Sequence, residues 1–421
     1  MKHNFRIVIG MLLFTIPLCL NAQVKPVKSD NKGDKPKTEK PMVKPERPEV
    51  RPEKPEVRPE KPGMRPDGPM RPEGPKPGMS EPKGGFEMPK ISGFVQGMYQ
   101  ANLDESGKLM DGDKSSTFRM RRVRMSIDGT LAKGLTYKIQ GDFTRKPMLV
   151  DAFVKYKACN EFAIQVGQFK TPFTIESPIN PVNLEIFDYG ESVQKLGGYS
   201  DVCGVGSLGR DLGIMATGSL FPIEKQNGEK FGLVDYSLGV FNGNGANEKD
   251  NNNRKDIVGR LDIHPGMKAL TLSGSYYYGN YYKDAKNNGV RNRWAAGMQY
   301  NDGDLIVRAE YLSGTTGSLL DIVGPDGQVT GTTEILTGSK GYYAVAGYNF
   351  KVGKDRNQKL MPVLRYEHFA EVAALGGTDW YTMGINYWPI KSLNFKLDYS
   401  LNMNGDDINS HRVVGMVSYK F

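Results

Sequence analysis

The chain has 421 residues, with 56 Lys or Arg against 47 Asp or Glu, 50 Gly, 26 Pro and only 3 Cys. So few cysteines exclude a disulfide-built scaffold, and abundant glycine with abundant aromatics is typical of a β-protein rather than a helical enzyme. The net charge of +9 is uneven, because residues 23–85 hold sixteen Lys or Arg and eleven Asp or Glu. The basic character therefore belongs mainly to this segment, and it predicts no nucleic-acid binding.

Residues 1–22 are predicted to be a secretory signal peptide. Two basic residues precede the apolar stretch Ile7–Leu20, which is too short to span a membrane, and Ala22 offers a small residue for cleavage. Cys19 leaves a lipoprotein signal as an alternative, but the residue before it is large, whereas lipid attachment normally requires a small one. We expect the protein to leave the cytoplasm.

Residues 23–85 are predicted to be a disordered, Pro/Lys/Glu-rich extension. The heptapeptide Pro48–Lys54 recurs at once as Pro55–Lys61, and no aromatic residue occurs in the segment. Such a sequence cannot bury enough apolar surface to offset its chain entropy, and its prolines favour an extended chain. A periplasmic spacer is the simpler interpretation. The alternative is an arm that contacts peptidoglycan or another envelope partner.

Residues 86–421 are dominated by apolar–polar alternation of period two, which indicates strands. In Leu393–Leu401 and Val413–Phe421 the odd-numbered positions are mainly apolar, and most of the even-numbered ones are polar. We count sixteen strands between Lys90 and Phe421. A soluble β-sandwich would show the same alternation, so other features must decide between the two architectures.

Three features favour a transmembrane barrel. The strand number is even, the connections alternate between short and long, and aromatic residues lie near strand ends. The long connections are Leu103–Ser116, Thr171–Gly209, Asn244–Arg254 and Ser313–Ser339. The aromatic residues expected at the membrane interfaces are Tyr276, Tyr277, Tyr278, Tyr281, Tyr282, Trp380, Tyr381, Tyr387 and Trp388. The fold class is therefore all-β, a 16-stranded antiparallel transmembrane β-barrel with both termini periplasmic.

The strand parity predicts which charges face the lumen. The predicted channel-lining, anion-binding cations, together with two at the third loop, are Arg122, Arg124, Lys138, Lys155, Lys157, Lys170, Arg210, Arg260, Arg308, Arg365, Lys396 and Arg412. Four of them precede a carboxylate by two residues on the same face: Arg260/Asp262, Arg308/Glu310, Arg365/Glu367 and Lys396/Asp398. These pairs could simply brace the wall, or the cations could form steps along which an anion moves.

Two further features bear on the lumen. Arg119 and Arg121 alternate with the inward arginines, so we expect them to point outward at the rim, toward lipopolysaccharide phosphates or a neighbouring subunit. The connection Thr171–Gly209 is acidic, and we expect it to fold into the bore, pair with wall cations and set the constriction.

Short motifs along residues 86–421 resemble the phosphate-selective porin O/P family. They are Phe118–Arg124, Leu135–Lys138, Asp151–Tyr156, Val166–Phe173, Arg210–Gly213, Val240–Gly243 and the terminal Phe421. The resemblance implies a 16-stranded barrel, usually trimeric, whose third loop narrows a basic bore. It matches Arg121 and Arg122 to the family's basic pair and Lys170 to its Gln-Phe-Lys segment. Arg210 lies where the loop rejoins the wall. A dense ladder of unpaired arginines is not evident, which leaves phosphate selectivity open. The leader and extension are similar to Bacteroides-like envelope proteins.

The predicted function is a passive outer-membrane porin of a Gram-negative cell that prefers anions, with selectivity for phosphate or another oxyanion left open. A general, weakly selective porin is one alternative. A barrel anchor whose extension tethers the membrane to peptidoglycan is another. We expect no enzyme activity, because His264, His368 and His411 form no constellation with a nucleophile. We expect no cofactor or metal. Expected partners are the transported anions, outer-membrane lipid and lipopolysaccharide, the barrel-assembly machinery through Phe421, and two further copies of the chain.

Overall fold

The computed structural model describes residues 88–110, 115–204, 206, 208–225, 228–282, 288–325 and 327–421. The predicted signal peptide and the predicted extension lie outside these residues. Neither of the two helices in the described part of the chain is long and apolar enough to cross a membrane.

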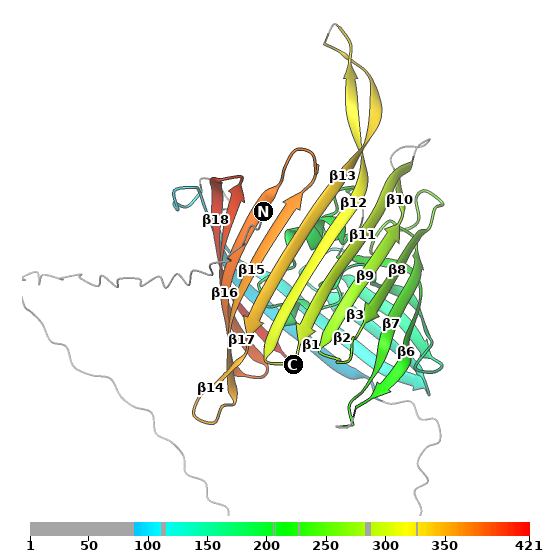
Figure 1. Cartoon of the computed structure of the whole chain (residues 1–421), viewed down its shortest axis with the longest axis vertical. Coiled ribbons are helices and arrows are strands. Elements are labelled where there is room, and N and C mark those ends of the chain that lie inside the picture. Colours follow the sequence, from blue (N-terminus) through cyan, green and yellow to red (C-terminus); the bar gives the residue numbers. More distant parts are fainter. Residues whose placement is uncertain are drawn as a thin grey trace, which may run out of the picture. The chain divides into compact units, whose positions relative to one another are not determined.

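The described residues form one antiparallel sheet that closes on itself (Figure 1). Segments β9 and β10 both pair with β11, and β13 and β14 both pair with β15, so eighteen segments make sixteen strands and confirm the predicted fold. The segments are β1 Lys90–Leu103, β2 Ser116–Ala132, β3 Leu135–Asp142, β4 Leu149–Lys157, β5 Ala163–Lys170, β6 Arg210–Glu224, β7 Lys230–Phe241, β8 Asp256–Ile263, β9 Leu270–Tyr278, β10 Asn280–Tyr282, β11 Asn288–Asn301, β12 Leu305–Val323, β13 Val329–Tyr348, β14 Phe350–Val352, β15 Gln358–Ala370, β16 Thr378–Ile390, β17 Leu393–Asn404 and β18 Asp407–Lys420.

The first and last strands close the barrel. They pair from Phe94 opposite Lys420 to Leu103 opposite His411, and Gly93 and Phe421 exchange two backbone hydrogen bonds of 3.0 and 3.1 Å. Closure leaves no open sheet edge, which a lipid environment requires. The start of β1 and the end of β18 therefore lie at one end of the barrel, which we call the turn end. The opposite end, where β5 leads into residues 171–209, is the loop end.

Burial is inverted relative to a soluble protein. On β17, Leu397 is 55% exposed on the outside, while Asp398 beside it is fully buried inside. The outward faces carry an apolar surface suited to lipid. A row of neighbouring aromatic rings, some stacked and some tilted, crosses the outside of β11 to β16, formed by Trp294, Tyr311, Tyr342, Tyr366 and Tyr381.

The predicted aromatic girdle is therefore right only in part. Tyr276, Tyr278 and Tyr381 are outward and exposed. Tyr277 lies between two outward neighbours on one strand, so it must point inward, where its hydroxyl donates to Asp256. Tyr281 is also buried, and Trp380 packs against a lumen arginine, Arg412.

The expected long connection Ser313–Ser339 is not a loop. Within this stretch β12 and β13 remain paired, from Ser313 opposite Lys340 to Val323 opposite Val329. This hairpin stands clear of the rest of the barrel at the loop end (Figure 1). The sequence prediction was wrong here because small and polar residues interrupt the apolar alternation once a hairpin leaves the lipid.

Residues 171–209 enter the barrel from the loop end and contain the short helices η1 Pro181–Asn183 and α1 Glu191–Leu196. Their apolar side chains join a buried cluster inside the barrel. The cluster combines Phe173, Leu184, Ile186, Tyr189, Val193 and Leu196 of the loop with Phe169, Phe241, Val258, Tyr277, Ala295, Leu312, Tyr343, Val345, Val363 and Phe369 of the wall. Burying each large side chain contributes roughly 2 kcal/mol, so the loop is held firmly against one side of the bore.

Candidate functional site

The acidic loop is clamped to the wall by buried ion pairs. Glu176 contacts Arg365 at 2.5 Å, and Glu185 contacts Arg308 at 2.6 Å. Two further pairs, with distances of 2.7 and 2.6 Å, are Asp188–Arg122 and Asp201–Arg293. These contacts confirm the expectation that loop carboxylates pair with wall cations inside the bore.

Backbone groups of the loop complete the attachment. The N–H groups of Ile175, Phe187 and Ser192 donate to the wall carboxylates Glu310, Asp398 and Glu367, each at 2.8 Å. Lys396 donates to the carbonyl oxygens of Leu184 and Ile186. The loop is thus bonded along its length to several strands.

Only two of the four predicted same-strand pairs are in contact. Arg260 lies 2.9 Å from Asp262, and Arg365 lies 3.4 Å from Glu367. The other two cations bind the loop instead, as do the carboxylates that were expected to neutralise them. The wall charges therefore serve mainly to hold the loop.

The loop carboxylates differ in protonation behaviour. Burial by itself raises the pKa of Asp188, but the charges and hydrogen bonds of Arg122 and Arg121 outweigh it and hold this pKa well below its ordinary value. Glu176 follows the same logic, with its pKa lowered by Arg365 and Arg308 against the effect of burial. Glu191 is the exception: burial raises its pKa, and the charge of Lys195 offsets this only in part.

A β-bulge overturns the prediction for Arg119 and Arg121. The register between β1 and β2 shifts at Gln96/Gly97, so Gln96 faces Arg122 while Gly97 faces Met120. The extra residue reverses the side-chain parity beyond it. Arg121 consequently points inward and shares Asp188 with Arg122, and Arg119 points inward to Gln100 at 3.1 Å.

Two larger cavities lie inside the barrel beside the loop. A cavity of about 320 Å³, here called the basic cavity, lies between the loop and the inner wall of β2 to β6. Its charged lining residues are Arg124, Lys138, Lys170, Arg210 and one carboxylate, Asp151.

The second cavity, here called the loop-end cavity, measures about 290 Å³. Its charged lining residues are three arginines, Arg119, Arg121 and Arg412, and three carboxylates, Asp188, Glu191 and Glu367. Along β2, Arg121 lines the loop-end cavity and Arg124 lines the basic cavity, with Arg122 between them. We call the contact of Asp188 with Arg121 and Arg122 the neck.

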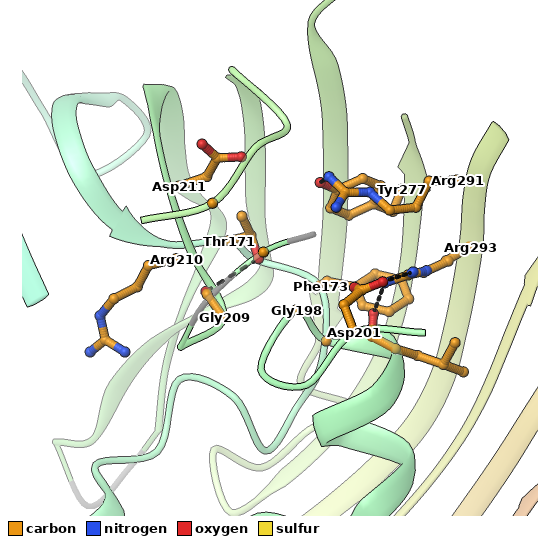
Figure 2. A pocket seen from close by; sticks show the side chains of 14 residues that line it. Thr171, Phe173, Gly198, Asp201, Gly209, Arg210, Asp211, Tyr277, Arg291 and Arg293 are labelled. Carbon is orange, nitrogen blue, oxygen red and sulfur yellow. Dashed lines mark hydrogen bonds and ion pairs between the residues drawn. The ribbon is translucent and has the colours of Figure 1, made fainter. Parts of the chain in front are cut away.

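A third, much smaller cavity of about 20 Å³ lies where the loop rejoins the wall (Figure 2). Arg293 grips both oxygens of Asp201 at 2.6 and 2.7 Å, and Arg291 contacts Asp256 and the Tyr277 hydroxyl. Its side chains bond mainly to one another and leave room for about one water molecule.

The predicted lining cations fall into four groups. Five are in buried ion pairs: Arg122, Arg124, Arg210, Arg308 and Arg365. Three bind loop carbonyl oxygens, Arg260 at Thr174, Lys170 at Ile179, and Lys396 at Leu184. Lys138 lies 3.4 Å from Asp128. Among the described residues, no carboxylate lies within ion-pair distance of the remaining three, Lys155, Lys157 and Arg412.

Sequence reasoning missed Arg119 and Arg121 as lumen residues and did not single out Arg291. No group of His, Cys, Asp and Glu in the described part of the chain is arranged to hold a metal ion.

Residues 95–304 match the family model described as phosphate-selective porin O and P. The fold is similar to that of OmpF of Salmonella typhi in complex with daunomycin, at 14% identity and a TM-score of 0.54, with 79% of this chain and 97% of that chain covered. It is also similar to an anion-selective porin from Comamonas acidovorans, at 14% identity, a TM-score of 0.53 and coverage of 79% and 99%. A third similar structure is the outer membrane channel DcaP of Acinetobacter baumannii, at 14% identity and a TM-score of 0.53, with 79% of this chain and 97% of that chain covered. No curated protein matches the chain in sequence.

Proposed function

Since the chain belongs to the phosphate-selective porin O and P family, we propose that it is a passive outer-membrane channel for small hydrophilic solutes that prefers anions. The lipid-suited outer face and the charged interior support a channel. Transport needs no reaction, so the proposed channel is not an enzyme.

The basic cavity is the observation that carries the anion preference. Arg124 and Arg210 are paired with Asp142 at 2.9 Å and Asp151 at 2.7 Å. The other two cations of the lining are Lys170, which donates to the Ile179 carbonyl oxygen, and Lys138, whose ion pair with Asp128 is longer, at 3.4 Å. Lys138 is partly exposed to the cavity, and Lys155 faces inward on the neighbouring strand. A low-dielectric wall strengthens the field of such charges on a passing ion.

The neck joins the two ends of the proposed route. A solute entering from the loop end meets the loop-end cavity first, then the neck, and then the basic cavity. Tyr189 lines the loop-end cavity, and its hydroxyl lies 3.0 Å from the Lys170 ammonium of the basic cavity. The loop therefore forms the partition between the two spaces, and its position sets the bore.

The zero-current potential across a KCl gradient tests the proposed preference. The reconstituted protein is expected to give an anion-sided potential, that is, one whose sign shows that chloride permeates more readily than potassium. Phosphate is expected to reduce the chloride current. Lys138→Gln should move the potential toward zero, because it removes a charge from the basic cavity. Lys230→Gln is the matched control, since Lys230 is 69% exposed at the turn end. A cation-sided potential would exclude the proposal and favour a general porin.

The remaining features of the proposed channel follow the family resemblance. Phosphate or another small oxyanion is its solute, the channel is a homotrimer, and both termini are periplasmic. Phe421 is the residue presented to the assembly machinery. Residues 1–22 are the signal peptide, and residues 23–85 are an extension that reaches the periplasm. If the protein conducts no current, the tether function of this extension becomes the better hypothesis, and deletion of 23–85 with a peptidoglycan pull-down tests it.

A further inference from the structure

The loop-end cavity differs in kind from the basic cavity. Its charged lining is balanced, with three arginines against three carboxylates, whereas the basic cavity has four cations against one carboxylate. A balanced lining does not attract anions as a class. It favours a solute that carries both signs of charge.

Most of these six charges are already engaged. Arg121 and Asp188 contact each other. Glu367 accepts hydrogen bonds from the backbone N–H and the hydroxyl of Ser192, at 2.8 and 2.7 Å, and lies near Arg365. Among the described residues, Arg119 and Arg412 form no ion pair, and Glu191 forms only the 3.9 Å contact with Lys195 of its own helix.

Arg412 is the free positive group. Its guanidinium lies between two aromatic rings, 4.6 Å from the centroid of Phe187 and 4.8 Å from that of Trp380. Its Nε is buried without a hydrogen-bond acceptor, and no described carboxylate lies within ion-pair distance. The two rings hold the guanidinium by cation–π contacts, which do not use its N–H groups, so these remain to bind a carboxylate. Arg119, bound only to Gln100 and Met98, adds a second cation nearby.

Glu191 is the free negative group. It begins α1, and its nearest cation is Lys195 of the same helix, at 3.9 Å. Its side chain is 36% exposed, so a solute in the cavity can reach it. Glu191 and Arg412 influence each other electrostatically, yet they form no ion pair. A gap of this kind between two opposite charges fits a molecule that bridges them.

We infer that the loop-end cavity is a binding site for zwitterionic solutes of the α-amino acid or short-peptide class, with the carboxylate on Arg412 and the ammonium group on Glu191. The cavity of about 290 Å³ is at the small end of ligand sites, which suits a solute of this size. Trp380 and Phe187 supply apolar walls for a side chain. The inference rests on the proposed function only in that bound solute would then pass through the neck.

Binding to the purified full-length protein in detergent tests this inference without any need for conduction. L-leucine should cause a saturable change in tryptophan fluorescence, which Trp380→Phe removes while calorimetry still detects binding. N-acetyl-L-leucine and L-leucine amide each lack one charge and should bind at least tenfold more weakly. Losing one charge-assisted hydrogen-bonded contact accounts for a factor of roughly 10 to 100.

Variants separate the two charges. Arg412→Gln should lower the affinity for L-leucine about as much as replacing L-leucine with L-leucine amide does. Arg412→Lys should restore part of the affinity. Glu191→Gln, at a partly exposed helix, should lower the affinity for L-leucine and leave the affinity for N-acetyl-L-leucine unchanged. Lys230→Gln is the control and should bind like the native protein. Equal binding of L-leucine and N-acetyl-L-leucine would mean a simple anion site and would overturn the inference, as would no saturable binding. An anion-sided KCl potential alongside either result would leave the proposed channel function standing.

Discussion

Replacing Asp188 with Asn should increase the anion selectivity of the channel. Asp188 is the carboxylate of the neck, in contact with both Arg121 and Arg122. The side chains of Arg121 and Asp188 are 18% and 9% exposed, so passing ions approach this pair closely. The substitution keeps the shape of the side chain and removes one negative charge at the neck of the proposed route.

The size of the effect follows from Coulomb's law. One unit charge acts on an ion about 5 Å away with about 0.8 kcal/mol in water, and screening at 0.1 M salt reduces this to about 0.5 kcal/mol. Anions gain and cations lose this amount, so their permeability ratio should rise about fivefold. In 1 M salt the same calculation gives less than a twofold change, because the screening length falls to about 3 Å.

The zero-current potential in KCl gradients at both salt levels measures this ratio. Glu224→Gln is the matched control, since it removes the same charge from an exposed strand end, where Glu224 is 61% exposed. Circular dichroism establishes that the barrel is intact. An unchanged or lower ratio for folded Asp188→Asn at 0.1 M would refute the placement of Asp188 in the ion path.

Three further changes test the loop and its charges. Glu176→Gln leaves Arg308 and Arg365 without their shared buried carboxylate, a loss that typically costs about 3–5 kcal/mol, so protease should cut residues 171–209 faster. Gly190→Ala should displace the loop and raise the conductance, because a Cβ atom there would lie 1.6 Å from the Arg365 guanidinium. Lowering the pH from 7 to 5 should weaken L-leucine binding, because Glu191, whose pKa is raised by burial, takes up a proton and loses the charge that holds the ammonium group.

Each of these tests has its own control. Glu248→Gln, at an exposed position in the connection between β7 and β8, should leave protease sensitivity at the native level. Ser200→Ala, an exposed loop position, should leave conductance unchanged. In Glu191→Gln the pH dependence of L-leucine binding between 7 and 5 should disappear. Its persistence would assign the titration to another group facing the cavity.

Alternation along the strands predicted most of the barrel. The inward positions of Arg308, Arg365 and Lys396 follow from period two alone, since one face of each strand must be apolar to meet lipid. The pairing of the acidic loop with the wall followed from charge. The inward positions depend on the alternation of residue types, and the loop–wall pairing depends on the distribution of charge. Neither depends on a particular contact, so one sequence was enough to predict them.

The bulge at Arg121 could not be predicted in this way. Four arginines crowd into Arg119–Arg124, so either parity leaves charged residues on both faces. The conflict disappears if one extra residue reverses the parity between Arg121 and Arg122, because all four then face the lumen. A run of charges incompatible with either register is the signal that was available.

The partner of each wall cation also required the structure. Residues two apart on a strand have Cβ atoms about 7 Å apart, so Arg308 and Glu310 are not forced together. A loop carboxylate approaching from the bore meets the arginine directly, and Glu185 does so. The inward apolar positions Ala295 and Leu312 interrupt the charged pattern, and they mark the part of the wall where the loop packs.

These contacts bear on the acidity of the loop, which from sequence alone argues against an anion filter. Four carboxylates of the loop form ion pairs with arginines of the wall: Glu176, Glu185, Asp188 and Asp201. A neutralised pair exerts little field at a distance, because the two potentials cancel. The sign of the lumen is then set by the cations without a carboxylate partner among the described residues, Lys155, Lys157 and Arg412, together with the partly exposed Lys138. An acidic loop is therefore compatible with an anion-preferring channel, provided that the loop stays bonded to the wall.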